Sequence, residues 1–216
     1  MGAIARNIAN NITTSGVFTS SAITNSSVTG ITVLANASDG ITFISSQTAS
    51  NSASISFTSG LDSTYKAYKF VFSNIHPRDD DVTFKFNMST DGGSNYNVTK
   101  TTTFFTARHS EDDATADLAY KTGGDLAQST SFQNLDENGA GNGADESSSG
   151  SLTIFNPSST VYVKHFIAVN NQYQSANGSY NNFIAGYGNT TSAVNAVRFQ
   201  FAVGNFDGTI YLYGIK

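Results

Sequence analysis

Residues 82–88, Val-Thr-Phe-Lys-Phe-Asn-Met, decide the fold class of this 216-residue chain. Every second position from Val82 to Met88 is apolar, and the positions between them are polar. Successive side chains of a β-strand point to opposite faces of the sheet, so a period of two predicts a strand with one buried face. Residues 197–203, Val-Arg-Phe-Gln-Phe-Ala-Val, follow nearly the same pattern. The chain is therefore expected to build a sheet that is buried on one side.

Segments of this kind recur from about residue 61 to the end of the chain, and turn-forming residues separate them. None of them has the spacing of an amphipathic helix. Many short strands with turns between them predict an all-β fold, a jelly-roll-like antiparallel β-sandwich. The expected strands are 65–74, 82–88, 101–108, 150–155, 161–170, 181–188, 197–203 and 208–214.

The end of the chain, residues 204–216, predicts a strand rather than a solvated tail. Thr, Ile, Tyr and Leu, which favour strands, follow the turn-forming pair Asp207-Gly208. A hairpin through that turn would place the terminal strand beside residues 196–203.

Residues 1–56 predict an extended N-terminal arm, and residues 57–216 predict the sandwich domain. Arg6 and Asp39 are the only charged residues of the arm, yet its apolar residues are too scattered to bury much against one another. Such an arm suits trimerisation or docking on another protein, and the alternative is a leader without partners. The expected arm contacts are Ile4, Ile8, Ile12, Phe18, Ile31 and Val33.

The composition disfavours two kinds of partner. Only 12% of residues are charged, about half the usual share, and the formal net charge is −5. A negative chain does not attract phosphates, so nucleic acid is not an expected partner. No run approaches the roughly 18 apolar residues of a membrane helix, and the N-terminus lacks the apolar core of a signal peptide. Membrane insertion is therefore not expected.

Carboxylates gather at Asp79, Asp80 and Asp81, which form the densest acidic group of the chain. Because Ca²⁺ prefers oxygen ligands, these three are the candidate metal ligands, and a solvated turn is the alternative. No other metal or cofactor is expected, since cysteine is absent and the histidines at 76, 109 and 165 lack the spacing of a ligand set. A Gly-x-Ser-x-Gly elbow is also absent, so no catalytic residue is assigned and the chain is not expected to be an enzyme.

Tyrosines alternate with polar residues in the segment 170–189, which the sequence suggests is rich in loops. Tyr173, Tyr180 and Tyr187 are therefore the candidate receptor surface, because rigid aromatics among Asn, Gln and Ser suit a wet binding site for glycans. An ordinary loop between strands is the alternative. A second long polar loop is expected at 122–150, partly packed through Phe132 and Leu135.

Three segments resemble a group of bacteriophage structural proteins, particularly those of marine phages: 59–77 (SGLDSTYKAYKFVFSNIHP), 89–105 (STDGGSNYNVTKTTTFF) and 205–216 (NFDGTIYLYGIK). The resemblance covers roughly residues 57–216, and DGGSNYNVTKT is its most specific element. It implies a virion protein, either a tail-fibre or adhesin module or a head-decoration protein. It also implies a trimeric jelly roll without catalytic residues.

The sequence thus predicts a non-enzymatic virion protein in which the arm attaches and the sandwich is displayed. Its expected partners are its own copies in a homotrimer, other virion proteins through the arm, and a host surface glycan. A fibre-like or spike-like trimer is favoured, and a head-decoration protein is the first alternative. A soluble glycan-binding module is the second alternative, and a glycan depolymerase is the enzymatic rival.

Overall fold

The computed structural model describes residues 40–216. This part of the chain contains strands and no helix, as the sequence predicts. The strands are β1 (Ile41–Ser52), β2 (Ile55–Phe57), β3 (Ala67–Pro77), β4 (Phe84–Ser89), β5 (Lys100–Ser110), β6 (Ala116–Tyr120), β7 (Gln133–Asn134), β8 (Ser148–Phe155), β9 (Lys164–Gln174), β10 (Gly178–Gly188), β11 (Ala196–Phe201) and β12 (Phe206–Ile215).

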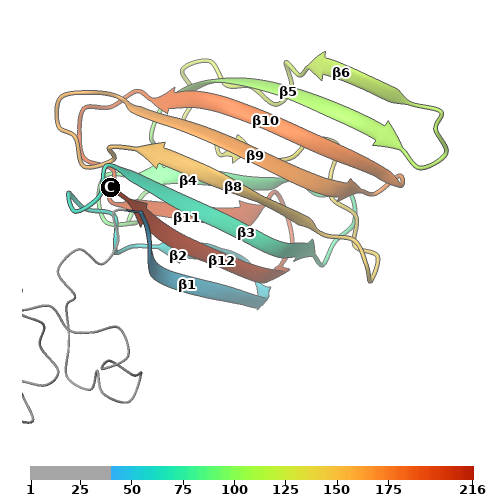
Figure 1. The fold of residues 1–216 in the computed structure, drawn as a ribbon, viewed down its shortest axis with the longest axis horizontal. Coiled ribbons are helices and arrows are strands. Elements are labelled where there is room, and N and C mark those ends of the chain that lie inside the picture. The colour runs from blue at the N-terminus through green and yellow to red at the C-terminus, as the bar shows by residue number, and fades with distance from the viewer. Residues whose placement is uncertain (1–39) are drawn as a thin grey trace, which may run out of the picture. The chain divides into compact units, whose positions relative to one another are not determined.

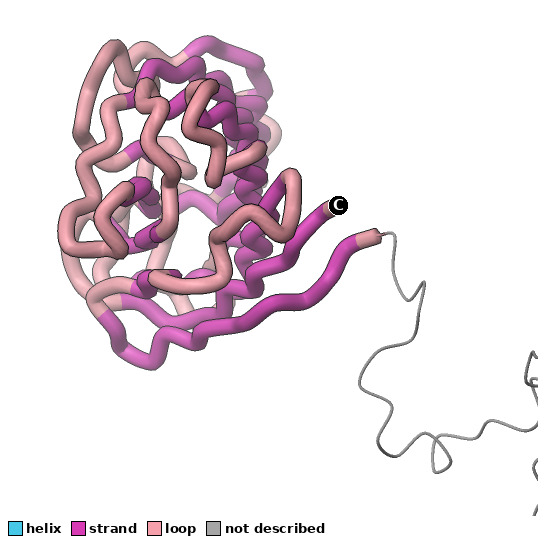
Figure 2. Tube along the Cα trace, turned by 90° about the vertical axis from the view of Figure 1, so that its left-hand side faces the viewer, coloured by secondary structure: helices cyan, strands magenta, loops and turns pink. Residues whose placement is uncertain are grey.

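These strands form two antiparallel sheets of unequal width (Figure 1). The larger sheet has eight strands in the order β1-β12-β3-β8-β9-β10-β5-β6, and the smaller has four in the order β2-β11-β4-β7. In Figure 2 the strands of the larger sheet stack in a column, and most of the loops lie on one side of it. The expected all-β antiparallel sandwich is confirmed.

Aromatic side chains fill the space between the two sheets. Phe199 of β11 lies at the centre, with its ring centroid 5.2 Å from those of both Phe70 and Phe72 on β3. Phe84 of β4 contacts Phe199 at 6.0 Å and Phe206 of β12 at the same distance. Each buried phenylalanine removes a large apolar area from water, worth about 1.5–3 kcal/mol. This cluster therefore holds the two sheets together.

The terminal strand is confirmed, but its predicted neighbour is wrong. β12 lies between β1 and β3 in the larger sheet, whereas β11 belongs to the smaller one. Residues 202–205 link the smaller sheet to the larger one, and Phe206, directly after this link, is buried in the core. The expected turn at Asp207-Gly208 is instead a bulge inside β12, where Gly208 has a φ of 130°.

The predicted boundary between arm and sandwich at 56/57 is also wrong, because β1 and β2 belong to the sandwich. β1 pairs with β12 along its length, and Ala49 and Ile55 are buried in the core. Serine, threonine and asparagine dominate β1. This edge strand therefore has the same composition as the predicted arm, and the sequence pattern assigned it to the arm. Residues 1–39 lie outside the described residues, and so do the predicted arm contacts at 4, 8, 12, 18, 31 and 33.

The smaller sheet has only four strands, so it does not cover the end of the larger sheet that contains β10, β5 and β6. There the inner face of β9, β10 and β5 is covered by the long segment between β6 and β8. Leu135 of this segment is fully buried and Phe132 is half-buried, which agrees with the expected partial packing. Gln133 on β7 accepts a 2.7 Å hydrogen bond from the hydroxyl of Thr102 on β5. The uncovered end of this half-sheet is where the candidate site lies.

Candidate functional site

Polar side chains form a row across the inner face of four strands near their ends. Gln172 of β9 stands opposite Tyr180 of β10, Tyr180 opposite Arg108 of β5, and Arg108 opposite Asp117 of β6. Residues directly opposite one another in antiparallel strands point to the same face. The row occupies the face that carries the aromatic core nearer the middle of the sheet, so polar groups replace the apolar core at this end.

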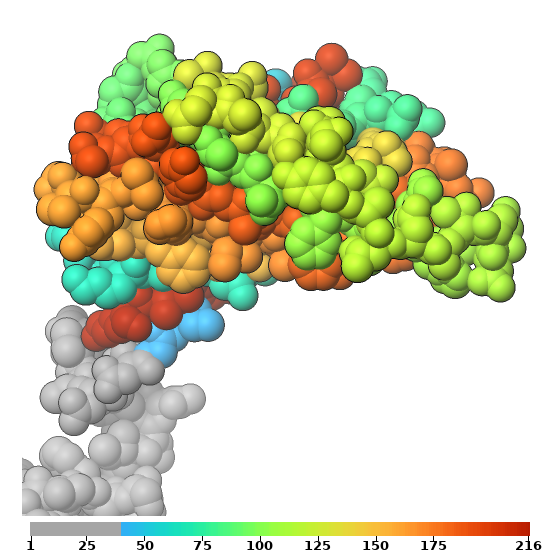
Figure 3. All heavy atoms as spheres, turned by 90° about the horizontal axis from the view of Figure 1, so that it is seen from above, coloured from blue at the N-terminus to red at the C-terminus, as the bar shows by residue number. Residues whose placement is uncertain are grey.

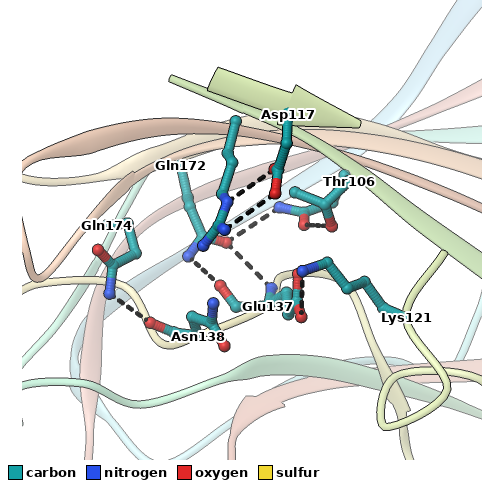
Figure 4. Close-up of polar contacts among 9 residues, drawn as sticks. Thr106, Asp117, Lys121, Glu137, Asn138, Gln172 and Gln174 are labelled. Carbon is teal, nitrogen blue, oxygen red and sulfur yellow. Dashed lines mark hydrogen bonds and ion pairs between the residues drawn. The ribbon is translucent and has the colours of Figure 1, made fainter. Parts of the chain in front are cut away.

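Arg108 is held in one orientation by Asp117. Its Nε and Nη2 donate to the two carboxylate oxygens at 2.7 and 2.9 Å (Figure 4). These two hydrogen bonds lower the pKa of Asp117, and together with the Tyr180 hydroxyl they raise the pKa of Arg108. Such a paired geometry fixes the plane of the guanidinium. The arginine is therefore a preorganised donor at the mouth of the site.

Below the arginine, buried amides connect the sheet to the covering segment. The Thr106 hydroxyl donates to Asn182 Oδ1 at 2.9 Å, and Asn182 Nδ2 donates to Gln172 Oε1 at 3.0 Å. Gln172 Nε2 then donates to the Glu137 carbonyl at 2.6 Å (Figure 4). Gln174 Nε2 makes a parallel bond of 2.8 Å to the Asn138 carbonyl.

The Glu137 side chain pairs with Lys121 at 3.2 Å, so the covering segment is also tied within itself. Because buried polar groups are costly unless paired, this network pins the segment under the sheet.

A pocket of about 550 Å³ opens where the network ends. It lies between the β5–β6 turn and the β9–β10 turn, which Figure 1 shows at the same end of the sheet; in Figure 3 the lime-green β5–β6 turn projects there. Its lining is Arg108, Ser110, Glu111, Asp112, Thr115, Gln174, Ala176, Asn177, Gly178 and Tyr180. This cavity is called the tip pocket below.

A second pocket of about 400 Å³ shares Ser110, Glu111 and Gly178 with the tip pocket. Its other lining residues include Asn171 and Tyr173, which point to the outer face of the sheet. The Tyr173 hydroxyl donates to Glu111 Oε1 at 2.9 Å, and this bond raises the pKa of Tyr173. Polar pockets thus lie on both sides of the same pair of turns.

Away from these turns, the outer face of the larger sheet carries apolar side chains on the same strands. Val169, Phe183, Phe105 and Tyr120 stand opposite one another across β9, β10, β5 and β6. The rings of Phe105 and Phe183 stack with their centroids 4.8 Å apart. Leu118 on β6 is 69% exposed. Ser, Thr and Asn occupy many of the other outward positions of these strands. The apolar outward side chains of β8, β9, β10, β5 and β6 are called the outer apolar face: Phe155, Ile167, Val169, Phe183, Tyr187, Phe105, Leu118 and Tyr120.

A shallow hollow of about 520 Å³ lies in this face, beside Phe155, His165, Ile167 and Tyr187. Ile167 is 52% exposed, although an isoleucine is normally buried. Apolar patches of this kind on a protein surface mark contact sites for other molecules.

The predicted tyrosine surface is not one surface. Residues 170–189 form the β9–β10 hairpin rather than a loop-rich segment, so that part of the prediction is wrong. Tyr173 borders the second pocket and Tyr180 the tip pocket, on opposite faces of the sheet. Tyr187 lies beside the apolar hollow towards the other end of β10. Glycan binding by any of the three stays a prediction.

Two of the three candidate metal ligands are engaged with neighbouring loops. Asp80 Oδ1 accepts a hydrogen bond from the Asn142 amide at 3.3 Å, and Asp81 Oδ1 accepts one from the Ser175 hydroxyl at 3.4 Å. Within residues 40–216 no three His, Cys, Asp or Glu side chains are grouped so as to hold a metal ion. Asp79, Asp80 and Asp81 are therefore not brought together as a Ca²⁺ site.

The histidines lie apart from one another. His76 Nδ1 is 2.6 Å from the Glu146 carbonyl, and His109 Nε2 is 2.9 Å from Asp113 Oδ1. His165 is exposed and its ring meets that of Tyr187 edge-on at 6.1 Å. His109 and His165 line different pockets.

The sequence reasoning missed the residues that build the tip pocket, above all Arg108, Asp117 and Gln174. A signal was present, because alternate residues of β9 change from Phe166 and Ala168 to Asn170, Gln172 and Gln174 along one face. A strand that turns from apolar to polar on its buried face indicates that the core ends and a polar site begins there.

No family model matches the chain, and neither a curated protein nor a solved structure matches it. None of the described residues forms a helix that could cross a membrane.

Proposed function

We propose that this chain is a non-enzymatic structural protein of a phage virion, which assembles as a trimer and displays its β-sandwich on the particle. The virion setting rests on the resemblance of residues 57–216 to phage structural proteins. The assembly rests on one structural observation, the outer apolar face. Residues 1–39 precede the sandwich and serve in this proposal as the attachment to other virion proteins.

The outer apolar face fits a second copy of the chain in its area. The five strands have 8, 11, 11, 11 and 5 residues. At a spacing of about 4.8 Å and a rise of about 3.3 Å per residue, their outer side covers roughly 700 Å². A stable interface between two proteins buries about 800 Å² on each partner. The face is therefore close to the size needed for a contact between copies of the chain, and the number of three copies rests on the resemblance to phage structural proteins.

Charge also favours a copy of the chain as the occupant. The outward positions of β8, β9, β10, β5 and β6 include no Asp, Glu, Lys or Arg, although the chain carries a net charge of −5. A face without charge meets its own copy without repulsion, whereas an exposed acidic face would not. Depletion of charge at the centre of a patch is also typical of protein interfaces.

The test is the solution mass of the full chain and of two variants by light scattering. We expect a trimer for the natural sequence and a monomer for Ile167→Glu, because a buried carboxylate without a partner costs several kcal/mol at an interface. Val203→Glu is the matched control, since Val203 is 61% exposed but lies on the link between β11 and β12. A monomer for the natural sequence, or a trimer for Ile167→Glu, would refute assembly through this face.

Two alternatives predict different results. A head-decoration protein would be present in hundreds of copies on each particle, whereas a fibre would be present in tens or fewer, so counting copies per particle separates them. A soluble glycan-binding module would remain monomeric at every concentration and still bind sugar. The polar pockets beside the β5–β6 and β9–β10 turns favour this second alternative.

A further inference from the structure

We infer that the tip pocket binds a neutral carbohydrate. This inference deepens the glycan-binding alternative and depends on no oligomeric state. Arg108, Gln174 and Tyr180 stand on the inner face of the sheet, and the proposed assembly uses the outer face. Sugar binding and assembly can therefore fail or succeed separately.

The size of the pocket suits one or two sugar rings. Its volume of about 550 Å³ falls within the range of about 300–1,000 Å³ that is usual for sites of small ligands. Two β-turns form its sides, and the fixed strands β5 and β10 form its base. Recognition of a small ligand depends on such a largely preformed cavity.

The polar groups of the lining are held in place before any ligand arrives. Asp117 fixes the guanidinium of Arg108 through two hydrogen bonds. Gln174 is 6% exposed and held by bonds from its Nε2 to Asn138 and from the Ala176 amide to its Oε1. Donors and acceptors with fixed positions suit a ligand that offers hydroxyls in fixed directions. Carbohydrates are ligands of this kind.

The charge of the lining excludes anionic ligands. Glu111 and Asp112 stand at the pocket, and Asp117 lies directly behind Arg108. Asp117 thus neutralises Arg108, the one cation of the lining, and the carboxylates of Glu111 and Asp112 leave the lining negative. Phosphate, sulfate and acidic sugars would meet net negative charge there. A neutral ligand avoids this repulsion, and its hydroxyls can donate to the carboxylates.

Apolar ligands are excluded by the same lining. Ala176 is its only aliphatic residue, and the ring of Tyr180 is mostly covered, with Gly178 packed against it. The hollow in the outer apolar face has the opposite character, since Phe155 and Ile167 border it. The two sides of one half-sheet therefore select different partners.

The test uses the full-length chain and six neutral methyl glycosides, those of glucose, galactose, mannose, N-acetylglucosamine, rhamnose and fucose. Saturation-transfer NMR detects weak binding of each, and N-acetylneuraminic acid serves as the anionic probe. Ala176→Trp places a large ring in the tip pocket, and Ser179→Trp places the same ring in the second pocket. Both positions are exposed, so neither change disturbs the core.

We expect at least one neutral glycoside to bind, and we expect Ala176→Trp to raise the Kd of that glycoside by about tenfold or more. Ser179→Trp should change the Kd by less than about twofold. Thermal unfolding should match that of the natural chain for both variants. Solution mass should match for Ala176→Trp, whereas Ser179 lies on the outer face that the proposed assembly uses. Binding of N-acetylneuraminic acid alone, binding that survives Ala176→Trp, or no binding of any of the six glycosides would each overturn the inference. None of these results bears on the mass of the natural chain, which tests the proposed assembly.

Discussion

At the scale of single residues, Lys100 and Asp136 have the largest pKa shifts among the fully buried ionisable side chains, and burial also lowers the pKa of Lys164. Lys100 is fully buried, and its Nζ donates to Asn87 Oδ1 at 2.5 Å and to the Val98 carbonyl at 2.8 Å. Burial lowers the pKa of Lys100 to about 7. Asp136 is equally buried, and burial raises its pKa well above the usual value of 3.8. One of its oxygens accepts from the Phe84 amide at 2.8 Å and the other has no partner.

These two shifts act on stability in different pH windows. The folded state holds the Asp136 proton above pH 3.8, where the unfolded chain has lost it, so stability falls as the pH rises from there. The unfolded chain holds the Lys100 proton between pH 7 and 10.5, where the folded state has lost it, so stability rises with pH in that window. Both groups therefore destabilise the fold at neutral pH.

Replacing Lys100 tests this account. We expect Lys100→Met to remove a rise in unfolding free energy of up to about 1.4 kcal/mol per pH unit between pH 7 and about 9.5. The urea midpoint of the natural chain should increase over this range, and that of the variant should increase much less, because only the smaller effect of Lys164 remains. Lys69→Met, on the outer face of β3, should keep the slope. A variant whose midpoint rises as steeply as that of the natural chain would show that Lys100 is not the group responsible.

At the scale of elements, β11 and β12 show how a short link determines the sandwich. Consecutive strands usually pair in a hairpin, but here residues 202–205 pass from one sheet to the other. β11 then carries Phe199 into the smaller sheet, and β12 brings Phe206 into the larger one. The aromatic core therefore depends on strands that are adjacent in sequence and not paired with each other.

Phe199 should be the most sensitive core position of β11. Its ring meets those of five other phenylalanines from both sheets. We expect Phe199→Ala to lower the unfolding free energy by about 3–5 kcal/mol, because it leaves a large cavity between the sheets. Phe155→Ala, on the outer face and 41% exposed, should cost about 1 kcal/mol or less. Similar losses for both variants in urea unfolding would contradict this view of the core.

At the scale of the whole sandwich, the unequal width of the two sheets has the largest consequence. The smaller sheet covers only part of the larger one, and the segment between β6 and β8 covers the rest through buried amides. The inner face of the larger sheet thus ends in a polar pocket, while its outer face stays bare and apolar. One half-sheet offers two surfaces of different chemistry.

The limits of the sandwich can be tested by truncation. A chain without residues 1–39 should keep the Tm of the full chain within a few degrees, because residues 40–216 contain the whole described core. A chain without residues 1–56 loses β1 and most of β2, and with them the buried Ala49 and Ile55. We expect it to unfold at a much lower temperature or to aggregate through the exposed edge of β12. Equal Tm values for the two truncated chains would show that the sandwich begins at about residue 57, as the sequence pattern predicts.

Much of the fold could be predicted because alternation is a local property. The pattern at residues 82–88 and 197–203 marks β4 and β11, and all eight expected strands are present. Four strands were missed. β1 and β6 are edge strands that bury little, so Ser, Thr and Ala replace the apolar residues that make a strand recognisable, and β2 and β7 have only three and two residues. The candidate site was largely missed, since only Tyr180 of its lining was named.

The sequence by itself determined that this protein is all-β, where most strands run, and that its last residues form a strand. Those features depend on neighbours along the chain, which alternation and turn residues report directly. Only the tertiary structure decided that β11 and β12 lie in different sheets, that residues 41–57 belong to the sandwich, and that Arg108 meets Asp117 beside Tyr180. These features depend on hydrogen bonds and packing between residues far apart in sequence, and no local pattern encodes which strand will pair with which.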